Sequence, residues 1–291
     1  MIYGTGHYQF ELIDDFAKLP EGQTFGNITR VATDSKHNLY VFQRKDPAVL
    51  IFDPNGKFVS SWGSGLFKRA HGFKIVNDIA YVTDQVDCVC MIYTLEGQLK
   101  KTIGVRGQHS DTGCEDWHIL PLRASGPFNH PTELMPGPSG DLYVTDGYRN
   151  SRVHRFNKEG ELIQSWGQPG KTAPGEFHLP HSMAFSEDGT IHVCDRANTR
   201  IQSFTADGKF VSMWNVIGGP NDIARDKDGI FYIAEQATTH GKAAISVRQN
   251  NGEVIARWDS APVHGMCIDS KGNIYAGLTA LGRVNKYSRV H

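Results

Sequence analysis

Hydrophobic and polar residues alternate in short runs along this chain, and the clearest example spans residues 177–204. Two alternating runs there are joined at Asp188-Gly189, and two more are joined at Asp207-Gly208. An Asp-Gly pair between alternating runs is a strong mark of a β-hairpin. The pattern predicts four short strands that run up and down in one antiparallel sheet.

The rest of the chain repeats this four-strand unit. Self-similarity at a period of about 20–50 residues is the signature of a repeat architecture. The motif of the second strand occurs six times, at residues 38–44, 79–85, 141–147, 190–196, 229–236 and 273–279. The motif of the last strand occurs five times, at residues 56–63, 97–104, 160–167, 208–215 and 252–259.

A sixth copy of the last strand is missing after the final repeat, but residues 8–16 form a strand-like run before the first repeat. This run could be a disordered leader or a strand that pairs with the last repeat. We favour the strand, because a ring closed in this way leaves no open sheet edge. The sequence therefore predicts an all-β, six-bladed β-propeller with four antiparallel strands per blade. Residues 1–291 are expected to form one domain, with the N-terminal strand closing the last blade.

Composition and charge suit such a fold and narrow the expected partners. Of the 291 residues, 39% are hydrophobic, 10% are aromatic and 31 are glycine, which is typical of a turn-rich β protein. The 30 basic and 31 acidic residues leave a net charge of −1, so we expect no nucleic-acid partner. No apolar run is long enough to cross a bilayer, so we expect no membrane partner. The oligomeric state is left open.

The N-terminal residues and the cysteines favour a cytoplasmic location. Residues 1–15 lack the basic region and apolar core of a signal peptide. The five cysteines, at positions 88, 90, 114, 194 and 267, are odd in number and have no CxxC spacing. A reducing compartment is the simpler interpretation of such a set.

One polar position can be aligned on the innermost strand of every repeat, where side chains line the central channel of a propeller. It precedes the residue after the second strand by 15 positions in five repeats and by 14 in the second repeat. The aligned residues are Thr29, His71, Thr132, His181, Asn221 and His264.

Histidine occupies this position in every other blade, at His71, His181 and His264. Alternate blades of a six-fold ring lie a third of a turn apart, so the three imidazoles would meet on the axis. Three protein ligands and an open fourth position are typical of a catalytic zinc site. The sequence predicts a metal centre, with Zn2+ favoured and another divalent transition metal as the alternative. If no metal binds, these residues are polar fillers of a wet channel.

A second ring of side chains is expected where each repeat leaves its second strand. Arginine can bind a carboxylate there through a bidentate fork. A tyrosine next to a metal and guanidinium groups can serve as a general base. Alternatively, both arginines pair with neighbouring acids, Asp46 and Asp195, and the tyrosine caps its blade. The ring comprises Arg44, Gln85, Gly147, Tyr148, Arg196, Gln236 and Thr279.

Residues 105–127 form a long insertion between the second and third repeats. Loops of this length in a compact domain are usually functional or flexible, so we interpret the insertion as a lid that shapes the substrate site. A second metal site is the alternative, although the spacing matches no recognised one. The insertion carries His109, Asp111, Cys114, Glu115, Asp116 and His118. The expected substrate contacts, besides the arginines, are Gln85, Asn221, Gln236 and His118.

Several segments resemble the blade motifs of one family. DGYRNSR (146–152), FHLPHSMAF (177–185) and DRANTRIQSF (195–204) are the closest, and VFQRKD (41–46) and FKRAHGF (67–73) match more loosely. On these motifs the chain resembles an NHL-repeat propeller and, within that group, peptidyl-α-hydroxyglycine α-amidating lyase. The resemblance extends over nearly the whole chain.

The resemblance implies both a site and a reaction. The family cleaves the C–N bond of a carbinolamide, N–CH(OH)–COO⁻, and releases an amide and glyoxylate. The implied activity is a zinc-dependent carbon–nitrogen lyase that acts on a small carboxylate-bearing substrate, such as an α-hydroxyglycine derivative, without an organic cofactor. The implied residues are the zinc ligands His71, His181 and His264, the catalytic base Tyr148 and the substrate-positioning Arg44 and Arg196.

Two positions depart from the family pattern. Gly265 follows the last histidine, where the family has an aspartate that helps to bind a structural calcium, so the sequence leaves a Ca2+ site open. Arg149 follows Tyr148, where the animal enzymes have a disulfide-bonded cysteine.

Two other classes of function stay open at this stage. One is a non-catalytic NHL scaffold, which the three inward histidines and the lack of a basic stripe disfavour. The other is a metal-dependent hydrolase on the same propeller, such as a lactonase with carboxylate and asparagine ligands around calcium. Of that ligand type, the ring offers only Asn221.

Overall fold

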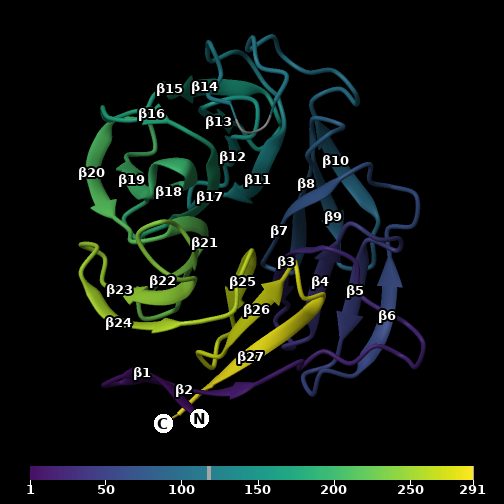
Figure 1. The fold of residues 1–291 in the computed structure, drawn as a ribbon. Helices are drawn as coiled ribbons and strands as arrows, with labels where there is room; N and C mark the ends of the chain where they lie inside the picture. The colour runs from purple at the N-terminus through teal and green to yellow at the C-terminus, as the bar shows by residue number, and fades with distance from the viewer. Residues whose placement is uncertain (117–118, 291) are drawn as a thin grey trace.

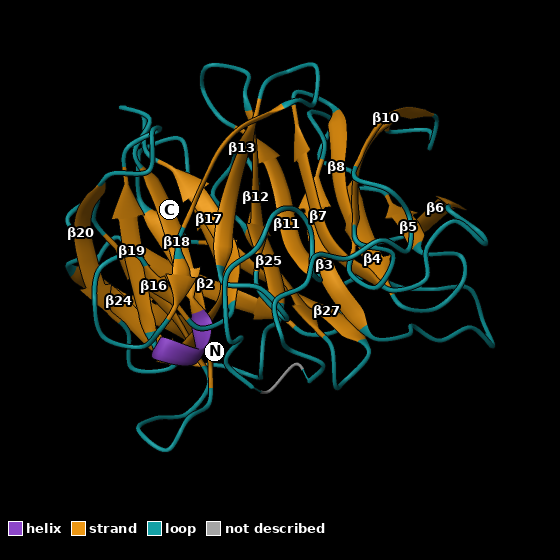
Figure 2. Cartoon of the chain, turned by 90° about the horizontal axis from the view of Figure 1, so that it is seen from above, coloured by secondary structure: helices purple, strands orange, loops and turns teal. Residues whose placement is uncertain are grey.

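The computed structural model is a ring of six β-sheets around a central channel (Figure 1). It describes residues 1–116 and 119–290. Each sheet is antiparallel, and its first strand lies at the channel. The next strands follow outward in sequence order in five sheets, whereas the two outermost strands of the sixth come from the N-terminus. Seen from above, the strands run through the thickness of the ring and loops emerge at both ends (Figure 2). The predicted six-bladed β-propeller is therefore confirmed.

The first three blades follow one another directly along the chain. Blade 1 contains β3 (Ile28–Thr33), β4 (Leu39–Gln43), β5 (Val49–Phe52) and β6 (Phe58–Trp62). Blade 2 contains β7 (Ala70–Val76), β8 (Ile79–Asp84), β9 (Val89–Thr94) and β10 (Leu99–Ile103). Blade 3 contains β11 (Pro131–Pro136), β12 (Leu142–Asp146), β13 (Arg152–Phe156) and β14 (Leu162–Trp166).

A short parallel ladder of β15 (Gln168–Pro169) and β16 (Glu176–Phe177) links blades 3 and 4. Blade 4 contains β17 (Pro180–Phe185), β18 (Ile191–Asp195), β19 (Arg200–Phe204) and β20 (Phe210–Asn215), with the 3-10 helix η1 (Arg196–Asn198) between its middle strands. Blade 5 contains β21 (Gly219–Arg225), β22 (Phe231–Gln236), β23 (Ala244–Arg248) and β24 (Val254–Asp259). Blade 6 contains β25 (Gly265–Ile268), β26 (Ile274–Leu278) and β27 (Arg283–Arg289).

An N-terminal strand closes the ring, as the sequence predicts. Strand β2 (Tyr8–Ile13) pairs antiparallel with β27, with Phe10 opposite Arg289 and Ile13 opposite Lys286. Figure 1 shows β2 beside β27, with the two chain ends close together. A further strand that the sequence analysis did not predict, β1 (Ile2–Thr5), pairs with β2 and makes this sheet five-stranded.

The hydrophobic core is divided among the blade interfaces. Each of the six buried clusters combines residues of two neighbouring sheets; for example, Phe42 of blade 1 packs on Phe73 of blade 2 at 5.2 Å between ring centroids. The outer strands join these contacts through tryptophan. A Cβ atom at Gly208 would lie 2.8 Å from the Trp166 ring. The turn of one blade therefore needs a residue without a side chain where it packs on the Trp of the preceding blade. This contact explains why the repeated motif begins with Gly and ends with Trp.

A buried histidine between blades 4 and 5 is expected to make stability depend on pH. His192 is 2% exposed, stacks on Trp214 at 4.5 Å and bonds to Ser186 and Ser203 through its two ring nitrogens. Burial lowers the pKa of His192 to about 4. The unfolded chain, with a histidine pKa of about 6.5, therefore binds more protons below that pH, and stability falls as the pH decreases from about 6.5 toward 4.

At pH 5 this difference corresponds to about 2 kcal/mol of unfolding free energy. We expect His192→Gln to reduce the loss of stability between pH 7 and pH 5 by about that amount, measured by urea unfolding of the metal-free protein. His240→Gln, at an exposed position, is the matched control and should behave as the parent. A His192→Gln variant with the pH dependence of the parent would contradict this account.

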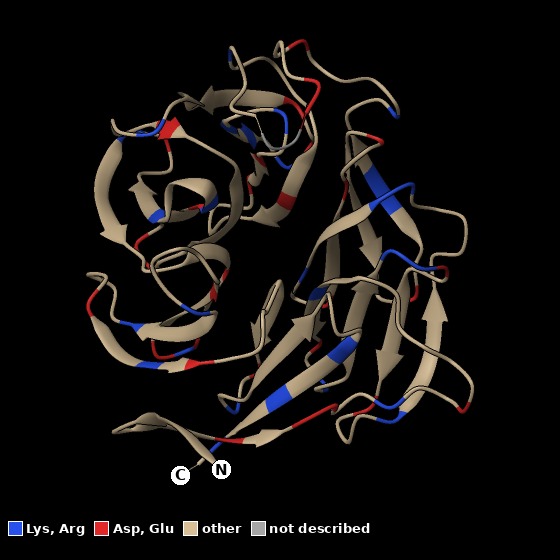
Figure 3. Ribbon diagram, viewed as in Figure 1, with Lys and Arg blue, Asp and Glu red and all other residues tan. Residues whose placement is uncertain are grey.

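Positions of basic and acidic residues are interspersed around the ring (Figure 3). In the part of the chain that the structure describes, no helix has the length and apolar character needed to span a membrane.

Candidate metal centre and active site

A β-bulge lies at the aligned ring position in five of the six innermost strands. A bulge interrupts the ladder and turns a residue out of its regular direction, and such bulges are frequent next to active sites. In blade 6, His264 directly precedes β25 and its amide donates to the Gly277 carbonyl at 3.0 Å. The five register shifts fall between Ile28 and Arg30, Ala70 and Phe73, Pro131 and Glu133, Pro180 and Met183, and Pro220 and Asp222.

The three predicted histidines meet on the channel axis. One ring nitrogen from each of His71, His181 and His264 lies within 4.8 Å of the other two. The ring centroids are 4.9 to 5.4 Å apart, and His71 and His181 are fully buried. The geometric idea behind the sequence prediction therefore holds in the structure.

The second nitrogen of each imidazole is fixed by the blade that follows it in the ring. His71 Nδ1 lies 2.7 Å from the Thr132 carbonyl, His181 Nδ1 lies 2.6 Å from the Asn221 carbonyl, and His264 Nδ1 lies 2.8 Å from the Thr29 carbonyl. A carbonyl only accepts, so Nδ1 carries the proton in His71 and His181 and their lone pair is on Nε2. His264 Nδ1 also lies 3.1 Å from Arg30 NH1, which only donates, so its contacts do not assign the tautomer. The three non-histidine blades thus orient the three histidines.

These imidazoles have the properties of metal ligands. Burial, together with the charge of Arg30 and the other nearby cations, lowers the pKa of all three well below the usual value, so the rings are neutral at neutral pH. Neutral rings with backbone-bonded Nδ1 groups match the common arrangement of metal-bound histidine. Three such donors suit zinc with an open fourth position, so the residues present fit a divalent transition metal.

The polar residues of two of the other three blades also brace the next histidine strand, whereas the Thr29 hydroxyl donates to the Phe42 carbonyl of its own blade. Thr132 Oγ1 donates to the Pro180 carbonyl at 2.8 Å, directly before His181. Asn221 Nδ2 donates to the Val263 carbonyl at 2.8 Å, directly before His264. Among the described residues, Asn221 Oδ1 has no hydrogen-bond partner although it is buried. Asn221 is thus partly a structural residue, with one oxygen left available at the site.

Tyr148 lies against the histidines, at the turn that follows β12. Its hydroxyl is 3.0 Å from His71 Nε2 and 3.2 Å from His181 Nε2. Gly147 permits this approach, because a Cβ atom there would lie 2.0 Å from the Pro180 carbonyl oxygen. The Gly-Tyr pair therefore brings the blade 3 turn directly onto the blade 4 strand that carries His181.

Both predicted arginines lie beside Tyr148. Arg196 NH1 donates to the Tyr148 hydroxyl at 3.4 Å, and its Nε and NH2 donate to Gln236 Oε1 at 3.2 and 2.9 Å. Arg44 Nε donates to the Ala70 carbonyl at 3.3 Å. Burial and the nearby Arg69 guanidinium lower the pKa of Arg44, while Tyr148 acts in the opposite direction.

The simple structural alternative for these arginines does not hold. Asp195 instead pairs with Arg200 at 2.7 Å, and Asp46 accepts the Gly65 amide at 2.9 Å. Neither carboxylate is paired with Arg44 or Arg196 in the described part of the chain. Both guanidinium groups are instead bonded to carbonyl, amide or phenol oxygens, which leaves their positive charge at the channel mouth.

The structure places Gln85 and Thr279 of the predicted second ring, but it does not describe His118. Gln85 is fully buried, accepts from Arg69 Nε at 3.1 Å, and its Nε2 has no partner among the described residues. Thr279 Oγ1 donates to the Ile28 carbonyl, which is a structural contact. His118 lies outside the described residues, so its predicted substrate contact stays a prediction.

The insertion at residues 105–127 packs on the turn that carries Tyr148. Thr112 Oγ1 donates to the Arg149 carbonyl, and the Ser125 amide donates to Asn150 Oδ1 at 3.3 Å. Thr112 and Cys114 are buried, and Glu115 lies 3.8 Å from Arg149. The insertion is therefore attached to the site at this turn, while its role as a lid stays a prediction.

Sequence reasoning missed a group of buried charges directly next to the histidines. They occupy the position after the ring residue in blades 1, 3 and 5, which carry Arg30, Glu133 and Asp222, each 0% exposed. Lys74 adds a second cation, 3.5 Å from Glu133 and 3.3 Å from Asp222. The sequence signal for this group is a charged residue directly after the aligned position in alternate blades.

The residues below the histidines do not fit a calcium ion. Calcium is bound by carboxylate and carbonyl oxygens, yet here the two carboxylates are already paired with Arg30 and Lys74. Burial opposes the ionisation of Asp222, but the two cations outweigh it and lower the pKa of that carboxyl. Among the described residues next to the histidines, no unpaired carboxylate is thus left for the Ca2+ site that the sequence left open.

Several curated relatives match most of this chain. It is 27% identical over 310 residues to peptidyl-glycine alpha-amidating monooxygenase B of Xenopus laevis, covering 90% of this chain and 34% of the relative. It is 28% identical over 190 residues to the probable peptidyl-alpha-hydroxyglycine alpha-amidating lyase pgal-1 of Caenorhabditis elegans, covering 65% and 51%. It is 28% identical over 295 residues to human NHL repeat-containing protein 3, covering 93% and 81%.

The chain spans about a third of the length of the Xenopus relatives that it matches. Among solved structures, a streptogramin B lyase has the same fold, with a TM-score of 0.68 at 13% identity over 96% of this chain and 97% of that one. No protein-family model matches the chain.

Fold and site together define a six-bladed β-propeller with a three-histidine group on its axis that could bind a metal. Its homologues are proteins named peptidyl-α-hydroxyglycine α-amidating lyase and NHL repeat-containing protein.

Proposed function

We propose that this protein is a metal-dependent lyase that cleaves the C–N bond of a carbinolamide-type substrate, such as an α-hydroxyglycine derivative. The products are an amide and glyoxylate. One observation carries the proposal: the Tyr148 hydroxyl lies 3.0 and 3.2 Å from the Nε2 atoms of two convergent histidines and 3.4 Å from the Arg196 guanidinium. The proposed base, the proposed carboxylate-binding cation and the proposed metal ligands therefore lie within hydrogen-bonding distance of one another. The amidating-lyase names of several distant homologues support it.

His71, His181 and His264 are the proposed metal ligands, with zinc preferred over other divalent transition metals. Zinc held there would supply Lewis-acid polarisation of the substrate hydroxyl. The protein contributes three neutral imidazoles whose orientation is fixed through the carbonyls of Thr29, Thr132 and Asn221. No electron transfer is involved, so no organic cofactor is proposed.

Tyr148 is the proposed general base. It takes the proton of the carbinol hydroxyl, and the O–H electron pair forms the carbonyl of glyoxylate as the C–N bond breaks. The pair from that bond stays on nitrogen, which gains the proton and leaves as the amide. Atoms balance without water or an oxidant, so the step is an elimination and not a hydrolysis.

Arg44 and Arg196 are proposed to hold the substrate carboxylate next to Tyr148. Gln236 supports this role, because its amide oxygen accepts two hydrogen bonds from Arg196 and sets the direction of the guanidinium plane. Gln85 Nε2 and Asn221 Oδ1, which have no partner among the described residues, are the proposed donor and acceptor for other polar atoms of the substrate.

The test is a metal analysis followed by a glyoxylate-release assay on N-acyl-α-hydroxyglycines. We expect bound zinc, release of glyoxylate, loss of activity on chelation and recovery with added zinc. In oxygen-labelled water, the lyase produces an unlabelled amide, whereas a hydrolase acting on the acyl group produces a labelled acid. A protein that binds no transition metal and releases no glyoxylate would instead favour a binding scaffold, the alternative that the similarity to NHL repeat-containing protein 3 keeps open.

A further inference from the structure

A fully buried guanidinium lies on the channel axis directly next to the three histidines. Arg30 NH1 donates to the carbonyls of Thr29 and His264 at 3.1 and 3.2 Å, and NH2 donates to the His181 carbonyl at 3.2 Å. Its Nε lies 3.3 Å from Glu133. Converging carbonyl and carboxylate oxygens are the donor set of a hard divalent cation, but here an arginine side chain occupies their centre.

We propose that Arg30, Lys74, Glu133 and Asp222 form an internal ion cluster that positions the histidine strands and takes the place of a divalent cation on the axis. Arg30 is then a positioning residue that acts on the metal centre through the carbonyls of His181 and His264 and through His264 Nδ1, which lies 3.1 Å from its NH1. The proposal deepens the metal-centre proposal above and rests on it for the effect on metal binding.

The cluster connects all six blades. Glu133 of blade 3 accepts from the Met183 amide of blade 4 at 2.9 Å, and Asp222 of blade 5 accepts from the Met266 amide of blade 6 at 2.8 Å. The Ser182 hydroxyl of blade 4 lies 2.8 Å from Glu133 and 2.6 Å from Asp222 and donates its one proton to one of them at a time. Arg30 adds blade 1 and Lys74 adds blade 2. A displacement of any one of the histidine strands would therefore break bonds to this cluster.

The charges of the cluster are balanced without any added ion. Two cations face two carboxylates, and the side chains of Arg30, Glu133 and Asp222 are 0% exposed. Each remaining oxygen of these carboxylates accepts from a hydroxyl or an amide. A further divalent cation would leave uncompensated positive charge in a buried site, which is costly.

Gly265 and Arg30 depend on each other. A Cβ atom at Gly265 would lie 2.5 Å from the Thr29 carbonyl oxygen and 2.8 Å from both Cα and Cδ of Arg30. A side chain at position 265 therefore cannot coexist with the observed path of Arg30. Glycine at position 265 is thus explained by the close approach of the Thr29–Arg30 backbone and of Arg30 Cδ.

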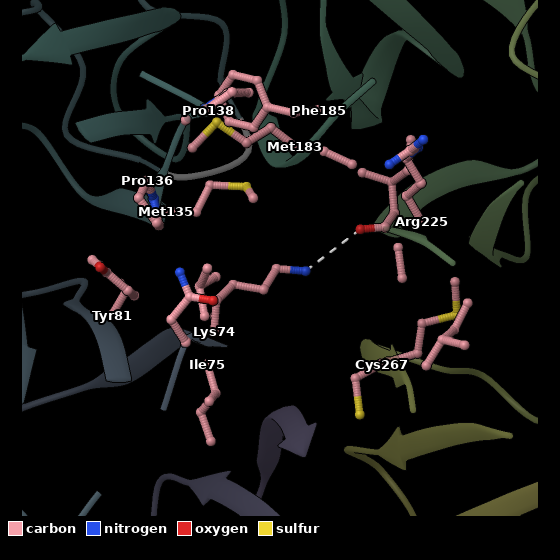
Figure 4. A pocket seen from close by; sticks show the side chains of 18 of the residues that line it. Lys74, Ile75, Tyr81, Met135, Pro136, Pro138, Met183, Phe185, Arg225 and Cys267 are labelled. Carbon is pink, nitrogen blue, oxygen red and sulfur yellow. Dashed lines mark hydrogen bonds between the residues drawn. The ribbon is translucent and has the colours of Figure 1, made fainter. Parts of the chain in front are cut away.

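Lys74 marks the other boundary of the cluster. Its side chain extends into a cavity of about 620 Å³ at the end of the channel away from the histidines, lined by residues such as Met135, Met183 and Phe185 (Figure 4). Among the described residues, the only group of side chains able to hold a metal is the three histidines and none lines this cavity, so we place the chemistry at the histidines. The ion cluster separates the two.

The test compares two variants that keep the charge balance of the cluster. Arg30→Lys retains the charge but loses the fork that reaches three carbonyls, and Arg30→Met/Glu133→Gln removes one charge of each sign. Arg283→Lys, at a surface ion pair, is the matched control. Metal-free proteins are titrated with Co2+, and the visible spectrum reports both affinity and ligand geometry.

We expect both cluster variants to bind cobalt about 10- to 100-fold more weakly than the parent, with an altered spectrum, because changes behind the ligands act in this range. Both should also unfold at lower temperature without metal. Unchanged affinity, spectrum and unfolding midpoint in both variants would overturn the proposal. The unfolding midpoint is measured without metal or substrate. It therefore tests the structural role of the cluster even if the protein releases no glyoxylate.

Calcium provides the second arm of the test. Added Ca2+ at about 1 mM, the range of weak protein sites, should leave the thermal midpoint of the parent unchanged, as should its removal with a calcium chelator. A thermal midpoint that rises with calcium would overturn the proposal that the ion cluster takes the place of a divalent cation on the axis.

Discussion

Replacing His181 by alanine is expected to remove the bound metal and the lyase activity together. His181 contributes one of three convergent nitrogens, and two imidazoles alone do not complete a zinc site of this type. We expect the loss of zinc affinity to exceed the roughly 100-fold that changes behind the ligands produce. Metal content by mass spectrometry and glyoxylate release measure the two effects on the same sample.

His181→Ala also removes the hydrogen bond to the Asn221 carbonyl, so the fold of the variant must be checked by its unfolding curve. His240→Ala is the matched control, because that side chain is exposed. A folded His181→Ala variant that retains one zinc per chain and full activity would show that the metal, if present, binds elsewhere.

Replacing Tyr148 by phenylalanine is expected to leave the metal bound and to lower kcat by about 10²- to 10⁴-fold, the usual contribution of a general base. The change removes only the hydroxyl that lies 3.0 Å from His71 Nε2 and 3.4 Å from Arg196. KM should change little, because the guanidinium groups proposed to bind the carboxylate remain. Steady-state kinetics with zinc analysis separates the two quantities.

Tyr143→Phe is the matched control for this experiment. Tyr143 is in the same blade, is buried, and directs its hydroxyl to the Ala206 carbonyl, not to the channel. A Tyr148→Phe variant with normal kcat would show that Tyr148 is not the general base, whether or not the variant binds zinc.

Most of the fold and the central group of the site could be predicted from the sequence. Four strands per repeat follow from alternation and Asp-Gly turns, and the N-terminal strand follows from the need to close the last sheet. The histidines could be aligned because one repeat position always faces the axis. The repeats thus convert a spacing in sequence into a position in space.

What the sequence could not show depends on contacts between blades. No spacing rule predicts that Thr132 and Asn221 serve His71 and His181 through their backbone carbonyls, since those carbonyls are freed by bulges. The pairing of Arg30 with Glu133 joins residues 103 positions apart, and its meaning appears only when the strands lie around one axis.

The ion cluster also affects how molecules move through the ring. Arg30, Glu133 and Asp222 are fully buried directly next to the histidines, so we expect the site to open at one end of the channel only. A reaction that makes two molecules from one must then release both through a single opening. The fragment nearer the closed end has to wait for the other, so the architecture imposes an order of departure on the products.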